Sequence, residues 1–258
     1  MESQPQQIDL SGKVAIITGA GSGIGEAIAK AFANAGARIA LAGRTASKLE
    51  SVAETLPSGS TQIIPLHHEV EDDVERGVNQ TVEHFGAIDI LVNNAGVYVP
   101  GRVAETPPNA WNDALALNLT GPALMTRAAL PHLRSRPGSS IINIASTLGI
   151  QAVAGTAPYS VAKAGLVQLT RIAALEEAAA GVRVNCICPG VVDTPIHRQR
   201  GLHEDALAEY MAAMRSAHPL GRVGEPGEIA ACALFLASSL SAWTTGSVIC
   251  VDGGISLA

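Results

Sequence analysis

The chain has 258 residues, 47% of them hydrophobic and 16% charged, which is enough apolar material to fill the core of one compact α/β domain. Its 17 basic and 23 acidic residues leave a net charge of −6, which disfavours a general binder of nucleic acid or anionic membranes. The start of the chain lacks the basic and apolar regions of a signal peptide, and no apolar run has the length of a membrane span. We therefore expect a cytoplasmic protein.

Apolar, β-rich runs alternate with alanine-rich runs of helical period along the whole chain. Strands are expected to begin near residues 14, 38, 63, 88, 140, 182 and 248, and helices to span 24–35, 46–55, 72–85, 109–130, 158–179, 204–215 and 226–238. The strand segments are continuously apolar, which is typical of parallel strands covered by helices on both faces. We predict a single doubly wound Rossmann domain over 1–258, with a seven-stranded parallel sheet.

The longest stretch without an expected strand is the segment 191–224. It carries Pro195 and an amphipathic helical run over 204–214. Ligands of open α/β sheets bind beyond the carboxyl ends of the strands, so we expect this segment to close over the site as a substrate lid. A packed surface excursion is the alternative.

A glycine-rich turn, Thr-Gly-Ala-Gly-Ser-Gly-Ile-Gly over 18–25, directly follows the first expected strand and opens the first helix. Such a turn lets the backbone approach a pyrophosphate, whose charge then meets the free N–H groups of the helix start. The strict G-x-G-x-x-G spacing is absent, but the strand before and the helix after favour a nucleotide site. No phosphate-binding motif of the G-x-x-x-x-G-K-[ST] type competes, so we expect a dinucleotide.

The residues after the second strand indicate which dinucleotide is bound. An NAD-preferring site usually has Asp or Glu there, to bond the ribose 2′-hydroxyl. This chain has Gly43-Arg44-Thr45 instead. The missing acid removes repulsion against a 2′-phosphate, and Arg44 offers that phosphate a charge-assisted fork, with Thr45 and Lys48 as helpers. We expect NADP(H); NAD is the alternative if Arg44 is only a solvated loop residue.

Tyr159 and Lys163 lie four residues apart at the start of a long helical segment, so both side chains share one helix face. A phenol with its ordinary pKa near 10 is a poor base at neutral pH, but an ammonium about 4 Å away favours the phenolate by roughly 4 kcal/mol. Such a pair can exchange a proton with a substrate oxygen. Ser146, at the end of the fifth strand, and Asn118, in the preceding helix, are expected at the same sheet edge.

Together these motifs resemble a classical short-chain dehydrogenase/reductase over nearly the whole chain. The resemblance rests on TGAGSGIG at 18–25, NNAG at 93–96, Asn118, Ser146, YSVAK at 159–163, CPGVVDTP at 188–195 and VDGG at 251–254. The spacing of Tyr159 and Lys163 is that of the classical group rather than of the enoyl-reductase branch. The resemblance implies hydride transfer between a nicotinamide and a carbonyl or secondary alcohol, with no metal.

The resemblance also implies individual roles. Tyr159 would be the acid–base group, and Lys163 would lower its pKa and hold the nicotinamide ribose. Ser146 would hydrogen-bond the reacting oxygen, and Asn118 would fix a water in a proton relay behind Lys163. Around the cofactor, Asn94, Ala95 and Gly96 would line the adenosine side, and Pro189, Gly190 and Thr194 would frame the nicotinamide. The other implied cofactor contacts are Gly19, Ser22, Gly23, Ile24, Gly25, Arg44, Thr45, Glu69, Val70 and Val192.

One position departs from the family pattern. The family usually has Asp near the adenine after the third strand, whereas this chain has His67-His68-Glu69-Val70. We expect Glu69 to substitute with its longer reach. The two histidines do not indicate a metal site, because neighbours on a strand point to opposite faces.

The substrate is left open by the sequence. Candidate pocket residues are mostly apolar, with two histidines as polar contacts: Val97, Tyr98, Leu148, Ala152, Val192, Met211, Met214, His197 and His218. A medium-sized, partly apolar ketone or secondary alcohol fits, and so does a β-ketoacyl thioester, because 3-oxoacyl-carrier-protein reductases share these motifs. Another alternative is an NAD-dependent alcohol or sugar dehydrogenase. A non-catalytic dinucleotide-binding module is disfavoured, because it would tolerate loss of the proposed catalytic residues.

The expected partners are a small-molecule substrate and further copies of the chain, with no nucleic acid and no membrane. The resemblance implies a homotetramer, built through the helices expected at 109–130 and 158–180 and through the carboxyl end. The alanine-rich composition of these helices is compatible with close helix packing.

Overall fold

The computed structural model describes residues 8–200 and 203–258. Within them, seven strands form one sheet in the order β3-β2-β1-β4-β5-β6-β7, and every neighbouring pair is parallel. The predicted seven-stranded doubly wound sheet is confirmed. The strands are β1 (Val14–Thr18), β2 (Arg38–Gly43), β3 (Thr61–Pro65), β4 (Ile90–Asn93), β5 (Ser140–Ile144), β6 (Arg183–Pro189) and β7 (Val248–Val251).

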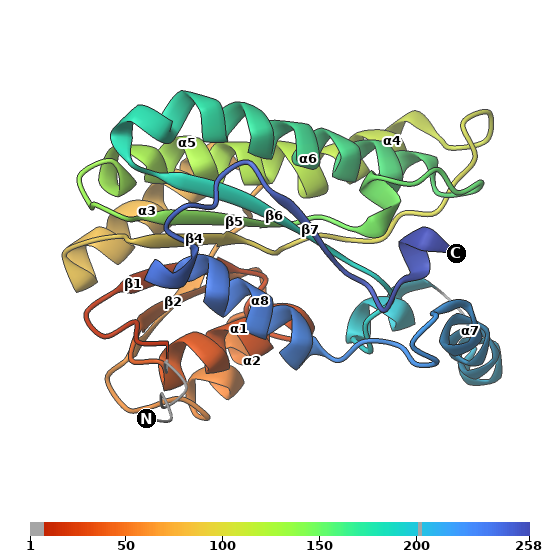
Figure 1. The fold of residues 1–258 in the computed structure, drawn as a ribbon, viewed down its shortest axis with the longest axis horizontal. Helices are drawn as coiled ribbons and strands as arrows, with labels where there is room; N and C mark the ends of the chain where they lie inside the picture. The colour runs from red at the N-terminus through yellow and green to blue at the C-terminus, as the bar shows by residue number, and fades with distance from the viewer. Residues whose placement is uncertain (1–7, 201–202) are drawn as a thin grey trace, which may run out of the picture.

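Helices cover both faces of the sheet (Figure 1). One layer consists of α1 (Gly23–Asn34), α2 (Ala46–Ala53) and α8 (Pro226–Ala237). The opposite layer consists of α3 (Glu71–Phe85), α4 (Pro108–Leu115), α5 (Gly121–Leu133) and α6 (Ala157–Glu177). The sheet is therefore the middle of three layers, and its carboxyl edge stays free for a site.

Strand β1 shows why continuous apolar runs predict this arrangement. All five of its residues are buried. Val14 and Ile16 belong to the core cluster under α3, α5 and α6, whereas Ala15 and Ile17 belong to the cluster under α1 and α8. Because successive side chains point to opposite faces, a strand with two covered faces needs apolar residues at every position.

The helix expected over 109–130 is not a single α-helix, and this corrects the prediction. A π-helical turn, Ala116–Thr120, separates α4 from α5, and the Gly121 amide donates to the carbonyl of Ala116 rather than of Leu117. The cause lies in the sequence: Pro122 has no N–H, so the regular α-helical bond to the Asn118 carbonyl cannot form. Asn118 therefore lies on an irregular turn.

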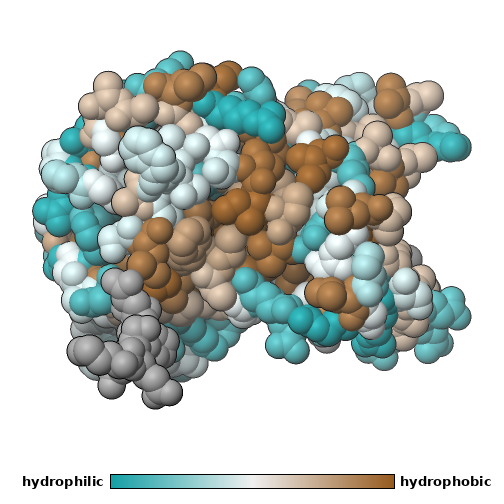
Figure 2. Space-filling model, viewed as in Figure 1, coloured by the Kyte–Doolittle hydropathy of each residue, from teal (hydrophilic) through white to brown (hydrophobic). Residues whose placement is uncertain are grey.

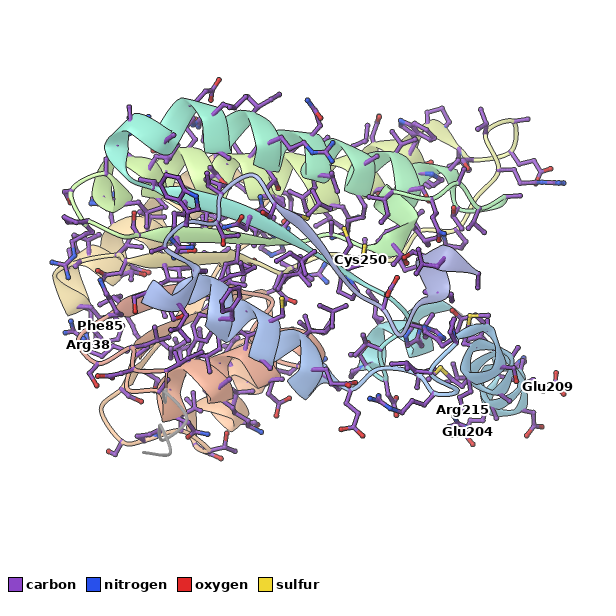
Figure 3. The ribbon with its side chains drawn as sticks, in the orientation of Figure 1. Arg38, Phe85, Glu204, Glu209, Arg215 and Cys250 are labelled. Atoms are coloured by element: carbon purple, nitrogen blue, oxygen red, sulfur yellow. The ribbon has the colours of Figure 1, made fainter. Side chains whose placement is uncertain are left out.

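The segment 191–224 contains a 3₁₀ stretch at Pro195–Arg200 and helix α7 (Glu204–Ala217). Helix α7 projects beside the carboxyl end of the chain (Figure 1). Its charged residues Glu204, Glu209 and Arg215 point away from the body of the molecule (Figure 3), whereas Tyr210 and Met214 line the main pocket. The amphipathic run thus forms a wall of that pocket, as its period predicts.

Apolar side chains gather over the middle of the face on which α8 and β7 lie (Figure 2). In the same region of the sequence, Trp243 and Leu240 are exposed, at 102% and 44%. On the opposite layer, Ile172 and Leu175 of α6 are exposed as well.

No helix in the described part of the chain combines the length and the apolar character that a bilayer span requires.

Candidate active site

A pocket of about 720 Å³ opens at the carboxyl ends of the strands, on both sides of the β1–β4 neighbour pair where the strand order reverses. Loops from neighbouring strands diverge at such a point, and ligands of doubly wound sheets bind there. Most of the predicted site residues line its wall: Gly19, Ser22, Gly23, Ile24, Arg44, Thr45, Asn94, Ala95, Gly96, Val97, Asn118, Ser146, Leu148, Tyr159, Lys163, Pro189, Gly190, Val192, Thr194 and Met214.

The glycine-rich turn is packed too closely for side chains at two positions. A Cβ at Gly25 would lie 2.3 Å from the carbonyl oxygen of Gly19 and 2.5 Å from Nδ2 of Asn94. Gly19 itself adopts a φ of +65°, and a Cβ there would lie 2.9 Å from the Cα of Ala95. The bare backbone lets α1 begin directly beneath the pocket, with its N–H groups facing an incoming anion.

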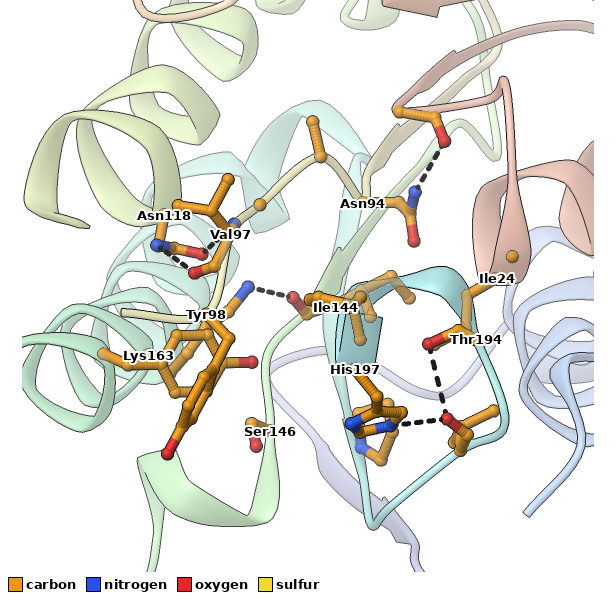
Figure 4. A pocket seen from close by; sticks show the side chains of 18 of the residues that line it. Ile24, Asn94, Val97, Tyr98, Asn118, Ile144, Ser146, Lys163, Thr194 and His197 are labelled. Atoms are coloured by element: carbon orange, nitrogen blue, oxygen red, sulfur yellow. Dashed lines mark hydrogen bonds between the residues drawn. The ribbon is translucent and has the colours of Figure 1, made fainter. Parts of the chain in front are cut away.

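Thr18 joins this turn to the end of β4. Its Oγ1 accepts hydrogen bonds from the amides of Asn94 and Ala95, both at 3.0 Å. In return, Nδ2 of Asn94 donates to the carbonyl oxygens of Thr18 at 2.9 Å and of Gly19 at 3.3 Å (Figure 4). The Asn94 side chain therefore supports the turn, in addition to lining the pocket.

The pocket end beyond β2 is basic. Arg44, Thr45 and Lys48 line it, and all three residues are exposed. None of the described residues that line the pocket is an aspartate or a glutamate. An anionic group at this end would meet a guanidinium and no repelling carboxylate.

Lys163 and Tyr159 project from the first turns of α6 into the opposite end of the pocket, and they are 3% and 8% exposed. Nζ of Lys163 donates a 2.8 Å hydrogen bond to the carbonyl oxygen of Ile144 (Figure 4) and lies 5.8 Å from the centroid of the Tyr159 ring. Burial lowers the pKa of Lys163 to about 8. The predicted pair is thus brought together within the pocket.

Tyr98 packs against Tyr159, with ring centroids 5.2 Å apart and planes tilted by 60°. Tyr98 follows β4, so this contact joins the β4 loop to the start of α6. Ser146 lies beside Tyr98 and Lys163 in the view of Figure 4. It caps a 3₁₀ turn, and its Oγ accepts a hydrogen bond from the amide of Leu148 at 3.2 Å. That bond uses an oxygen lone pair and leaves the hydroxyl proton for an acceptor in the pocket.

The Asn118 side chain is fully buried and holds the backbone. Its Nδ2 donates to the carbonyl oxygens of Val97 and Ala114, both at 3.0 Å, and its Oδ1 accepts the Val97 amide at 3.2 Å. The amide group therefore joins the π-helical turn to the loop that carries Val97 and Tyr98 (Figure 4). Both Nδ2 hydrogens are thereby used within the protein, and Oδ1 keeps one lone pair.

The wall after β6 is held by two histidines. Nε2 of His197 donates a 2.8 Å hydrogen bond to the carbonyl oxygen of Val192, which also accepts from Thr194 at 3.3 Å (Figure 4). His218 joins α7 to this wall, because its Nδ1 bonds the Met214 carbonyl and its Nε2 accepts the Val191 amide. His197 lines the pocket, whereas His218 lies behind it.

Several predicted contact residues lie outside the pocket wall, and their roles stay predictions. Glu69, Val70, Met211 and Ala152 do not line this pocket, and Gly25 lies just behind the turn. Val70 is the N-cap residue of α3, so the chain has already left the sheet edge at that point. Leu66 and His68 line the pocket instead.

Other lining residues escaped sequence reasoning, among them Gln151 and Tyr210. Tyr210 could have been found from the amphipathic period of α7, because it lies four residues before Met214. Gln151 follows the short turn after β5 and carries no comparable pattern. Among the described residues, no group of three His, Cys, Asp or Glu side chains is placed to hold a metal ion.

Comparisons with known proteins agree with this geometry. A family model described as enoyl-(acyl carrier protein) reductase matches residues 19–256. The chain is 37% identical to bovine (Bos taurus) L-fucose dehydrogenase, over 96% of this chain and 90% of that protein. It is 36% identical to a 3-oxoacyl-[acyl-carrier-protein] reductase of Thermotoga maritima, over 95% of this chain and 98% of that protein.

A crystal structure of a short-chain type dehydrogenase/reductase from Mycobacterium marinum superposes with a TM-score of 0.89. The two sequences are 35% identical, and the match covers 96% of each chain. Family and fold are those that the motifs predict, and the reaction class follows from them: oxidoreduction between an alcohol and a carbonyl with NAD(P). The chain belongs to the short-chain dehydrogenase/reductase family.

Proposed function

We propose that this protein is an NADP(H)-dependent oxidoreductase that interconverts a ketone and a secondary alcohol, with Tyr159 as the acid–base group. One observation carries the proposal: Tyr159, Lys163 and Ser146 meet in the same pocket as the glycine-rich turn and Arg44. A hydride donor and a proton donor can therefore face one substrate carbon and oxygen.

The glycine-rich turn supports a dinucleotide in this pocket. Gly19 and Gly25 leave no room for side chains, so the turn presents backbone to a pyrophosphate. Asn94, Ala95 and Gly96 would lie against the adenosine half, and Pro189, Gly190 and Thr194 against the nicotinamide. The bound nicotinamide would supply or accept the hydride.

The preference for NADP(H) over NAD(H) rests on Arg44. Its exposed guanidinium lines the pocket end beyond β2, beside Lys48, and no carboxylate lines the described pocket wall. A ribose 2′-phosphate would gain a bidentate, charge-assisted contact there. The ratio of kcat/KM for NADPH and NADH tests this assignment. A preference for NADH would overturn it.

In the proposed mechanism, Tyr159 donates its phenolic proton to the carbonyl oxygen during reduction and recovers it during oxidation. Ser146 donates a hydrogen bond to the same oxygen and stabilises the charge that develops on it. Lys163 holds a positive charge behind the phenol and favours its ionised form. Asn118 and the π-helical turn would place a water behind Lys163 for proton exchange with solvent.

The substrate end of the pocket combines aromatic, apolar and polar side chains. Tyr98 and Tyr210 supply ring faces, Leu148 and Met214 supply apolar surface, and Gln151 and His197 supply polar groups. This lining favours a medium-sized, partly apolar ketone or secondary alcohol. The names of two relatives, L-fucose dehydrogenase and 3-oxoacyl-[acyl-carrier-protein] reductase, indicate a sugar and a β-ketoacyl thioester as further substrate classes to test.

The experiment is a panel of ketones, sugars and β-ketoacyl thioesters, assayed through NADPH absorbance at fixed enzyme concentration. Tyr159→Phe is the matched variant, because it keeps the ring against Tyr98 and removes only the hydroxyl. We expect its kcat to fall by at least 100-fold with cofactor binding unchanged. Activity within tenfold of the unaltered enzyme would overturn the role of Tyr159.

The proposal extends to assembly and location. We place a contact of the predicted homotetramer at α6, where Ile172 and Leu175, which are 44% and 82% exposed, would be covered by another copy of the chain. A cytoplasmic location stays a prediction. The segment 191–224 is proposed as a lid, on the ground that its Ile196, Tyr210 and Met214 form one wall of the pocket.

A further inference from the structure

His68 follows β3 and is buried at the edge of the pocket. Its side chain is 7% exposed, whereas that of the adjacent His67 is 55% exposed. Nε2 of His68 lies 2.8 Å from the carbonyl oxygen of Leu117, in the π-helical turn that carries Asn118. A carbonyl oxygen only accepts, so Nε2 carries the proton of this bond.

The carbonyl oxygen of Leu117 has lost the donors that a helix normally provides. In a regular α-helix the Gly121 amide would donate to it, but that amide donates to Ala116. In a π-helix the next candidate is residue 122, and Pro122 has no N–H. His68 therefore supplies, from another element, the hydrogen bond that the helix cannot make.

The surroundings of His68 fit this single role. A Cβ at Gly121 would lie 2.3 Å from Cδ2 of His68, so only glycine leaves room for the ring against α5. Oε2 of Glu69 lies 3.4 Å from the other ring nitrogen, Nδ1. The carboxylate would favour a proton on Nδ1, whereas burial, the stronger influence, lowers the pKa of His68 and favours the neutral ring. In both states Nε2 keeps its proton toward Leu117.

We propose that His68 is a positioning residue for the reaction, because its hydrogen bond to the Leu117 carbonyl oxygen fixes the π-helical turn and with it Asn118. The Asn118 side chain hydrogen-bonds both the amide and the carbonyl oxygen of Val97. The next residue, Tyr98, packs against Tyr159. Loss of the Leu117 bond would therefore loosen the turn behind Lys163 and the ring that supports the phenol. This inference rests on the proposed function of Tyr159, Lys163 and Asn118.

The test compares two substitutions of similar size in the full-length enzyme. His68→Gln can place an amide N–H near the position of Nε2, whereas His68→Met fills the space but cannot donate. We expect His68→Met to lower kcat at saturating cofactor by about tenfold or more, and His68→Gln to recover kcat to within about threefold. His84→Met, which changes an exposed histidine of α3 outside the pocket wall, is the matched control and should behave like the unaltered enzyme.

A second readout does not depend on activity. Hydrogen–deuterium exchange of the peptide covering 114–125 should be faster in His68→Met and unchanged in His68→Gln and His84→Met. If the enzyme reduces no carbonyl at all, the proposed function fails, and the exchange data still decide whether His68 holds the turn. If His68→Met does not fold, Gly121→Ala replaces it, because its Cβ would displace the His68 ring. Faster exchange over 114–125 is then the expected result, although alanine favours a helix more than glycine does.

Two results would overturn the proposal. Equal loss of kcat in His68→Met and His68→Gln would show that the volume of the ring matters and its donor does not. Unchanged exchange over 114–125 in His68→Met, or in Gly121→Ala if His68→Met does not fold, would show that the turn holds itself without the His68 bond.

Discussion

The side-chain nitrogen of Lys163 donates a 2.8 Å hydrogen bond to the main-chain carbonyl oxygen of Ile144, and both residues are buried behind Tyr159, the proposed acid–base group. A single neutral acceptor compensates little of the cost of burying an ammonium group. Burial consequently lowers the pKa of Lys163 to about 8, against 10.5 for an exposed lysine. Lys163 is placed for chemistry at the expense of stability.

The pH dependence of stability follows from this pKa. Between about pH 8 and 10.5 the unfolded chain binds the Lys163 proton and the folded protein does not, so the folded state gains stability as the pH rises. The gain amounts to about 3 kcal/mol at most. We expect urea unfolding of the unaltered protein and of Lys163→Met to show it. From pH 7.5 to 9.5, the unfolding free energy of the unaltered protein should rise relative to that of Lys163→Met. A difference that stays constant with pH would contradict the burial argument.

Cofactor preference can be tested by reversing the charge at Arg44. A charge-assisted hydrogen bond contributes ~1.5–3 kcal/mol, so Arg44→Asp should lower kcat/KM for NADPH by about 10- to 100-fold. The value for NADH should stay the same or rise, because an aspartate can accept from a ribose 2′-hydroxyl. Arg76→Asp, an exposed arginine on α3, is the control. Equal losses with NADPH and NADH would mean that Arg44 does not read the 2′-phosphate.

The close contact at Gly25 predicts a sharp response to one methyl group. Gly25→Ala would place a Cβ 2.3 Å from the Gly19 carbonyl, and overpacking of this kind costs ~1–3 kcal/mol. We expect a lower melting temperature and at least tenfold weaker NADPH binding, measured by cofactor fluorescence. Gly227→Ala is the matched control, since Gly227 also lies in a first helical turn but has open space around it. Similar behaviour of the two variants would refute the packing argument.

The predicted tetramer can be examined through the exposed face of α6. Leu175→Glu should produce smaller species in light scattering after size exclusion, because a buried carboxylate would destabilise a contact between copies. Val103→Glu changes a residue of similar exposure, 79%, that is outside the expected contacts. A monomeric unaltered protein would exclude the tetramer directly.

Much of this architecture could be read from the sequence, because its causes are local. Buried parallel strands need apolar residues at every position, and a phosphate-binding turn needs glycines where chain segments touch. The motif residues Ser146, Tyr159 and Lys163 were expected at one sheet edge because parallel strands end together there, and the structure places them so.

What the sequence could not show depends on contacts between distant elements. The sequence encodes the break in the helix at 116–120 through Pro122. The break leaves the carbonyl oxygen of Leu117 without a helical donor, and the donor that replaces it, His68, lies 49 positions away in the sequence. The alternation of side chains along a strand does not apply to His67 and His68, because both lie beyond the end of β3 and both ring Nδ1 atoms approach the carboxylate of Glu69. It could not predict that the chain turns into α3 at Val70, which removes Glu69 and Val70 from the pocket wall.

The Thr18 hydroxyl accepts hydrogen bonds from two backbone amides of the loop after β4. These bonds join the glycine-rich turn and that loop into one rigid unit before any ligand binds. A dinucleotide bound there would have little protein to order, so most of its contact energy would appear as affinity. Arg44 stands outside this unit, on the β2 side. The selectivity between NADPH and NADH and the overall affinity for the cofactor therefore depend on different parts of the protein. A substitution at Arg44 can change the selectivity while the glycine-rich turn and the β4 loop stay the same.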